Sequence, residues 1–119
     1  MYTIKVILNF SGAHNLRGYK GKCEDLHGHN WKIEVKVCAE KLDDIGMVLD
    51  FKELKTRLED VISDLDHKYL NELKYFKKDN PTSENLAKYI YDRISKRSPE
   101  LKIKSVTVWE TDTSSATYG

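Results

Sequence analysis

The stretch Trp31–Val37, "WKIEVKV", decides the fold of this chain. Apolar and charged side chains alternate along it without a break: Trp31, Ile33, Val35 and Val37 against Lys32, Glu34 and Lys36. A period of two places the two sets on opposite faces of a β-strand, so a half-buried strand is predicted here. Residues 2–10, "YTIKVILNF", alternate in the same way and predict a second strand, antiparallel to the first.

Downstream of this strand the apolar period changes to that of a helix. From Asp50 onward the apolar residues recur at the spacing of one helix face: Phe51, Leu54, Leu58, Val61, Ile62 and Leu65. Asp50 and Glu53 match the reciprocal capping box that starts a helix. A second helix is predicted to begin with Thr82 as its N-cap residue, directly after Pro81, and to stop before Pro99.

Strand character returns in 102–111, "KIKSVTVWET", and 114–119, "SSATYG", predicts a short last strand. The order ββααββ predicts one α+β domain over residues 1–119, in which two helices cover one face of a four-stranded antiparallel sheet. The opposite face is predicted to carry apolar side chains at Ile7, Cys38, Ile103 and Trp109. An apolar face of that kind favours a homo-oligomer that buries part of it.

Composition excludes several classes of partner. Twenty basic and 19 acidic side chains leave a formal net charge of +1, so no overall field attracts nucleic acid or a membrane surface. No apolar run approaches the roughly 20 residues that span a bilayer, and the N-terminus lacks a cleavable leader pattern. A cytoplasmic protein is expected, with its two cysteines kept as thiols.

Three of the four histidines fall in or beside the long irregular connection between the first two predicted strands. His27 and His29 are two residues apart, so extended backbone directs both imidazoles to one side. His14, at the end of the neighbouring strand, would complete three nitrogen ligands and leave the fourth position of a zinc ion open, as in catalytic sites. Nickel, iron or copper would suit the same ligands, and incidental histidines in a polar loop are the alternative.

Cys23 and its neighbours are the second candidate feature. Lys20 and Lys22 lie close to Cys23 in sequence, and nearby cations lower a thiol pKa, which would let the thiolate act as a base. An inert loop cysteine is the alternative, and local sequence alone leaves Glu24 and Asp25 as solvated charges.

Two further carboxylates are candidates. Asp66 directly precedes His67, and a neighbouring carboxylate can orient an imidazole and stabilise its protonated form for acid–base work. Glu110 is in phase with the inward-facing residues of its strand. An inward carboxylate needs a partner, and a ligand with paired N–H donors would provide one.

Six segments, in this order, resemble the 6-pyruvoyl-tetrahydropterin synthases and the bacterial and archaeal 6-carboxytetrahydropterin synthases: "FSGAH", "CEDLHGHNW", "GMVLDF", "LDHKYLN", "PTSENLA" and "VWETDTSSATY". The resemblance implies the tunnelling fold (T-fold), in which sheets from several subunits join into a barrel. It also implies a homohexamer of two trimers, with active sites at subunit interfaces.

The resemblance further implies a role for each candidate residue. His14, His27 and His29 match zinc ligands, Cys23 matches the catalytic thiol, and Asp66 with His67 matches its acid–base partner. Glu110 matches the carboxylate that anchors the pterin ring, and Thr82 and Ser83 match residues that line the pocket. The triphosphate of the substrate is expected to meet loop cations, namely Arg17, Lys20 and Lys22.

The C-x-x-x-H-G-H spacing resembles the enzyme of queuosine synthesis that converts 7,8-dihydroneopterin triphosphate to 6-carboxy-5,6,7,8-tetrahydropterin, acetaldehyde and triphosphate. Glu24, beside Cys23, keeps open an alternative. Members of the family with a glutamate near this position cleave the side chain to 6-hydroxymethyl-7,8-dihydropterin for folate synthesis. 6-Pyruvoyl-tetrahydropterin synthase activity, a bifunctional enzyme and a non-catalytic pterin-binding oligomer also remain open.

Overall fold

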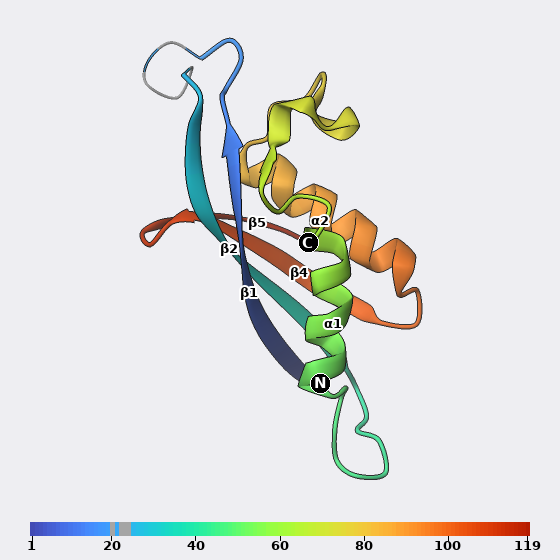
Figure 1. The fold of residues 1–119 in the computed structure, drawn as a ribbon. Helices are drawn as coiled ribbons and strands as arrows, with labels where there is room; N and C mark the ends of the chain where they lie inside the picture. Colours follow the sequence, from blue (N-terminus) through green and yellow to red (C-terminus); the bar gives the residue numbers. More distant parts are fainter. Residues whose placement is uncertain (20, 22–24) are drawn as a thin grey trace.

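The computed structural model describes residues 1–19, 21 and 25–119, and in these it forms a sheet with two α-helices on one side (Figure 1). The strands are β1 (Tyr2–His14), β2 (His27–Ala39), β3 (Lys68–Tyr69), β4 (Lys102–Thr111) and β5 (Ser114–Tyr118). The helices are α1 (Phe51–Ile62) and α2 (Ser83–Arg97), and two short 3-10 helices, η2 (Leu70–Glu72) and η3 (Lys74–Phe76), follow β3.

The sheet has the strand order β3-β1-β2-β4-β5. β1 and β2 are antiparallel and pair over their whole length, from Tyr2 opposite Ala39 to His14 opposite His27. β4 and β5 extend the sheet in antiparallel fashion, which confirms the predicted α+β class and its four main strands. β3 is the difference, because it adds a fifth strand parallel to β1. Two residues are too short to show a strand period, so the sequence did not reveal it.

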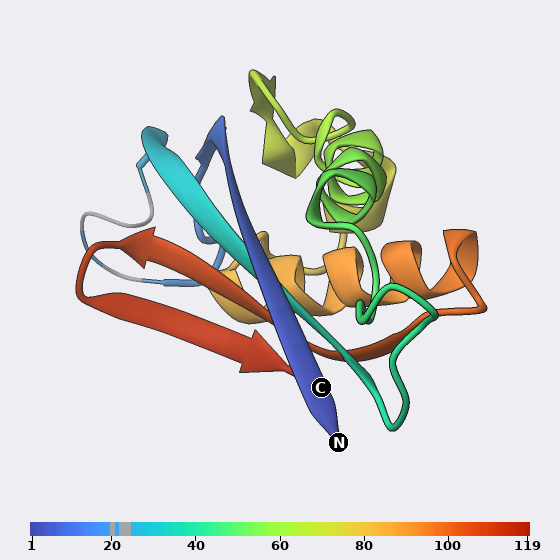
Figure 2. The ribbon, with the colours of Figure 1, turned by 90° about the horizontal axis from the view of Figure 1, so that it is seen from below.

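Both helices lie on the same side of the sheet (Figure 2). Asp50 caps α1 by accepting a hydrogen bond from the backbone N–H of Lys52 at 2.8 Å, as predicted. The second half of the capping box is replaced by an ion pair, because Glu53 contacts Arg57 one turn on. Thr82 caps α2 through a bond from the backbone N–H of Asn85, which confirms the predicted helix start.

The core lies between the helices and the predicted inner face of β2. Trp31, Ile33 and Val35 are fully buried there. Burial of one such side chain stabilises a fold by about 1.5–3 kcal/mol, so the alternating segment is a main source of stability.

The opposite face of the sheet differs from the prediction at one residue. Ile103 is buried in the core, because the pairing of β4 with β2 shifts register between Lys36 and Val37 and brings Ile103 opposite Val37. Ile7 is partly exposed, and Lys32 lies over the ring of Trp109 at 4.6 Å. Among the described residues, no helix is both long and apolar enough to span a membrane.

Candidate functional site

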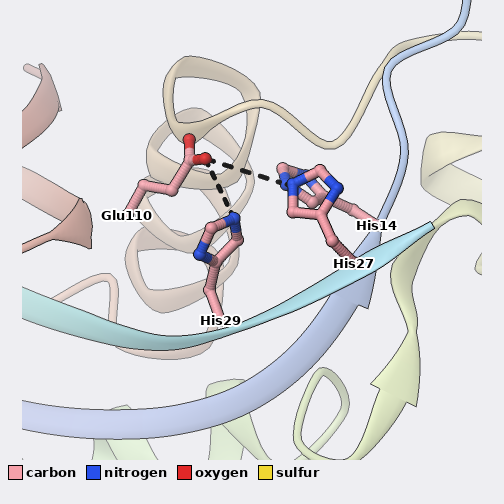
Figure 3. A group of neighbouring side chains, drawn as sticks. All are labelled: His14, His27, His29 and Glu110. Carbon is pink, nitrogen blue, oxygen red and sulfur yellow. Dashed lines mark hydrogen bonds and ion pairs between the residues drawn. The ribbon is translucent and has the colours of Figure 1, made fainter. Parts of the chain in front are cut away.

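Three histidine side chains meet where the paired strands β1 and β2 end (Figure 3). His27 and His29 share the inner face of β2 with Trp31, and His14 lies opposite His27 on β1. The Nε2 atoms of His14 and His27 are 2.9 Å apart. The alternation that directs the apolar side chains of β2 into the core thus also directs these histidines to the same side, at the end of the β1–β2 pair.

Two backbone carbonyls determine which nitrogen of each ring faces the group. His14 Nδ1 lies 2.7 Å from the carbonyl oxygen of Pro81, and His27 Nδ1 lies 2.7 Å from that of Asp25. A carbonyl can only accept, so each Nδ1 carries the hydrogen, and in a neutral ring Nε2 presents a lone pair. Two lone pairs at 2.9 Å repel each other unless a proton or a metal ion lies between them.

Glu110 completes the group from the end of β4, where the pairing with β5 is irregular. Its Oε1 atom is 3.0 Å from His29 Nε2 and 4.0 Å from His14 Nε2. Apart from this contact with Glu110, the buried His29 Nε2 has no polar partner within hydrogen-bond geometry among the described residues. One ligand atom from each of His14, His27, His29 and Glu110 lies within 4.8 Å of the others, so this set can hold a metal ion. Imidazole nitrogens with one carboxylate are ligands that zinc accepts.

Burial keeps His14 and His29 in the form that can bind metal. His14 is 1% exposed, and burial lowers its pKa from the ordinary value of 6.5, against smaller upward effects of the Pro81 carbonyl and Glu110. Burial also lowers the pKa of His29, again opposed by Glu110. A lower pKa leaves both rings neutral near pH 7, and only neutral imidazole coordinates a metal ion.

The start of α2 lies against His14. Pro81 provides the carbonyl that His14 contacts, and Thr82 and Ser83 follow directly as the N-cap and first residue of the helix. Thr82 uses its hydroxyl oxygen in the cap, and Ser83 is buried. The structure therefore brings these two predicted pocket residues next to the histidine group.

Asp66 and His67 lie at the outer edge of β1. Asp66 Oδ1 accepts from the backbone N–H of Ser11 at 3.0 Å, and the backbone N–H of His67 donates to the Ser11 carbonyl at 2.6 Å. The side chains of the pair meet at 3.6 Å, with His67 80% exposed and in a left-handed conformation at φ 56°. Both border an open recess of about 490 Å³ with Asn9 and Lys32.

The loop candidates differ in what the structure says of them. Cys23, Glu24, Lys20 and Lys22 lie outside the described residues. Arg17 is described, and its guanidinium donates to the carbonyl oxygens of the residues at 76 and 79. Its cation therefore holds a neighbouring turn, a role that the charge pattern did not predict.

Sequence reasoning also missed two asparagines beside the site. Asn71 and Asn80 each use the side-chain amide to bind the backbone just after His14. The only sequence signals were a polar residue in the apolar stretch "YLNEL" and an Asn–Pro pair. Neither pattern predicts a partner in the chain.

Comparison with known proteins agrees with this geometry. Residues 3–119 match the family model described as 6-pyruvoyl tetrahydropterin synthase. A 6-carboxy-5,6,7,8-tetrahydropterin synthase of Synechocystis is 37% identical, over 99% of this chain and 93% of the relative. A dihydroneopterin monophosphate aldolase of Pyrococcus furiosus is 39% identical, over 86% of this chain and 83% of the relative.

The structure of 6-pyruvoyl tetrahydropterin synthase from Caenorhabditis elegans matches with a TM-score of 0.89 and 32% identity, covering 98% of this chain and 94% of that one. This likeness confirms the subunit fold that the sequence motifs implied. The family model matches nearly the whole length of the chain, the fold is the same, and the histidine group lies at the matching motif. The chain therefore belongs to the 6-pyruvoyl tetrahydropterin synthase family.

Proposed function

We propose that this protein is a zinc-dependent lyase that converts 7,8-dihydroneopterin triphosphate to 6-carboxy-5,6,7,8-tetrahydropterin, with release of acetaldehyde and triphosphate. The observation that carries the proposal is the convergence of three imidazoles on one point, where the Nε2 atoms of His14 and His27 are 2.9 Å apart. The Synechocystis relative bears the name of this activity and aligns with almost the whole chain. The product would serve queuosine synthesis in the cytoplasm.

The proposed reaction assigns one task to each group. His14, His27 and His29 would hold the zinc ion, which when bound supplies a Lewis acid that makes protons of the substrate side chain easier to remove. Cys23 would remove such a proton as a base, and His67, steadied by Asp66, would donate or relay one.

Glu110 would receive the amino and ring N–H groups of the pterin, with Thr82 and Ser83 at the side of the same pocket. Its carboxylate lies 3.0 Å from His29, which would place the bound ring against the histidine group.

We also propose that the active protein is a homohexamer built as a dimer of trimers, with its active sites at subunit interfaces. Within one chain the Asp66–His67 pair is not part of the group of potential metal ligands, as far as the described residues show. His67 is 80% exposed and borders an open recess, as expected for a residue that a second subunit covers.

The proposal is tested by incubating the zinc-loaded protein with 7,8-dihydroneopterin triphosphate and identifying products by mass spectrometry. We expect 6-carboxytetrahydropterin and acetaldehyde in equal amounts, loss of turnover after chelation, and recovery on addition of zinc. Bound zinc without any turnover would instead support a non-catalytic pterin-binding oligomer. Pure protein without stoichiometric metal would contradict the metal centre itself.

A second candidate activity is cleavage of the side chain to 6-hydroxymethyl-7,8-dihydropterin. It is favoured by the 39% identity to the Pyrococcus relative, whose name is that of an aldolase, and by the neighbouring Cys23 and Glu24. Parallel assays with dihydroneopterin monophosphate and triphosphate separate the two. If Cys23→Ala abolishes the carboxy product and Glu24→Ala abolishes the hydroxymethyl product, the protein is bifunctional.

A further inference from the structure

The outer edge of β1 is covered by an unusual ladder of hydrogen bonds. Along an extended strand, alternate residues direct both N–H and C=O to the same edge. Ser11 uses both groups toward Asp66 and His67, and Ala13 pairs with Tyr69 of β3. Up to the end of β3, the edge is therefore covered by the Asp66 carboxylate, the His67 backbone N–H and β3 itself.

Beyond β3, two side chains continue the ladder in place of a strand. Asn71 accepts from the backbone N–H of Asn15 at 3.0 Å and donates to its carbonyl at 2.9 Å. Asn80 does the same for Arg17, with both bonds at 2.9 Å. A primary amide offers one acceptor and one donor side by side, so it can replace the backbone of a missing strand partner.

Asn80 also connects this ladder to the histidine group. The backbone carbonyl oxygen of Asn80 accepts one hydrogen bond from the backbone N–H of Thr82 and one from the side-chain amide of Asn85, each at 2.8 Å. Asn80 is thus held at both its side chain and its carbonyl. The next residue, Pro81, has a fixed φ angle, and its carbonyl oxygen is the one that orients His14.

We propose that Asn80 is a positioning residue for the metal centre, which sets the orientation of the His14 imidazole through the Pro81 carbonyl. The inference rests on the proposed metal centre. Groups that hold a ligand imidazole through its second nitrogen commonly change metal affinity by about 10- to 100-fold when removed. Asn80 acts one step further out, at the residue that fixes the position of that carbonyl.

The test measures zinc affinity of the full-length, metal-free protein by competition with a chromogenic chelator, and the visible spectrum of the cobalt-loaded form. Asn80→Ala is expected to raise the zinc dissociation constant about 10-fold and to change the cobalt absorption bands. Asn85→Ala removes one of the two bonds to the Asn80 carbonyl and is expected to have a smaller effect in the same direction.

Tyr91→Phe is the matched control. Like Asn85→Ala, it removes a hydrogen bond from a side chain of α2 to a backbone carbonyl, here the bond from the Tyr91 hydroxyl to the Ile103 carbonyl in β4. Its zinc dissociation constant is expected to stay within twofold of wild type.

The inference is overturned if Asn80→Ala binds zinc like wild type, or if Tyr91→Phe weakens zinc binding as much as Asn80→Ala does. If the wild type binds no zinc, the proposed function fails as well, so the two failures are distinguishable. If Asn80→Ala does not fold, the test rests on Asn85→Ala, and a zinc dissociation constant equal to that of wild type in this variant overturns the inference.

Discussion

The two halves of β2 follow one backbone pattern and perform opposite tasks. From Trp31 to Val37, alternate residues enter a core in which every inward side chain is apolar and fully packed. At His27 and His29 the same alternation directs two imidazoles inward, and the buried Nε2 of His29 has no hydrogen bond to any residue that the structure describes. The core half is complete within the chain, whereas the histidine half is a group that can hold a metal ion.

The largest expected effect comes from breaking the core half. Ile33→Ala removes a fully buried side chain and leaves a cavity, so the free energy of unfolding should fall by about 2–5 kcal/mol. Urea unfolding monitored by circular dichroism measures it. The molecules that remain folded should bind zinc as wild type does. A loss of zinc binding in the folded fraction would contradict the separation of the two halves.

Breaking the histidine half should lower zinc affinity strongly and the unfolding free energy little. His29→Ala removes one of the three proposed zinc ligands, so zinc affinity should fall by more than about 100-fold. Loss of a group that only supports a ligand lowers metal affinity by about 10- to 100-fold. The unfolding free energy of the metal-free protein should change far less than in Ile33→Ala. Competition titration and urea unfolding of the same samples measure both. Retained zinc binding would remove His29 from the ligand set.

The histidine half should also be sensitive to acid. The pKa of His14 and of His29 is lowered from 6.5 in the folded state, so at lower pH the unfolded chain binds more protons. Stability of the metal-free protein should be fully present above about pH 6.5 and fall below it, by at most about 1.4 kcal/mol per pH unit for each group. His14→Asn should flatten the profile. Parallel profiles for wild type and His14→Asn would refute this.

The smallest effect is expected at the helix cap beside the site. Thr82→Ala removes the oxygen that accepts from Asn85 and should cost about 1 kcal/mol of unfolding free energy. Thr82→Ser keeps the oxygen and should restore most of that loss. A Michaelis constant for the pterin that is raised in both variants, although Thr82→Ser restores stability, would indicate that the threonine methyl group contacts the substrate. Full recovery of both would limit Thr82 to its cap.

Much of this organisation was predictable because it depends on local periods. Alternation in 2–10 and 31–37 and the helical spacing from Asp50 indicate which face of an element is buried, and the structure agrees except at Phe51, which is exposed. The Thr82 cap marks the start of the second helix, as predicted. The histidine group followed from an i, i+2 pair and an antiparallel neighbour. Glu110 was predicted to point inward, and its carboxylate is found among the ring nitrogens.

What failed or was missed depends on contacts between distant segments. Ile103 was placed on the wrong face because a register shift against β2 changes its phase, and a bulge leaves no pattern in the residues around it. The parallel strand β3 and the amide ladder of Asn71 and Asn80 join residues more than fifty positions apart. Local spacing carries no information on such partners.

The left-handed backbone of His67 constrains how its chemistry can be studied. At φ 56°, most side chains strain the chain, while glycine and asparagine adopt this conformation readily. An alanine at position 67 would therefore remove the imidazole and disturb the backbone that bonds to Ser11, and the two losses would be indistinguishable. Asparagine is the substitution that deletes the imidazole and leaves the turn as it was, so any mutational scan of this protein should use it there.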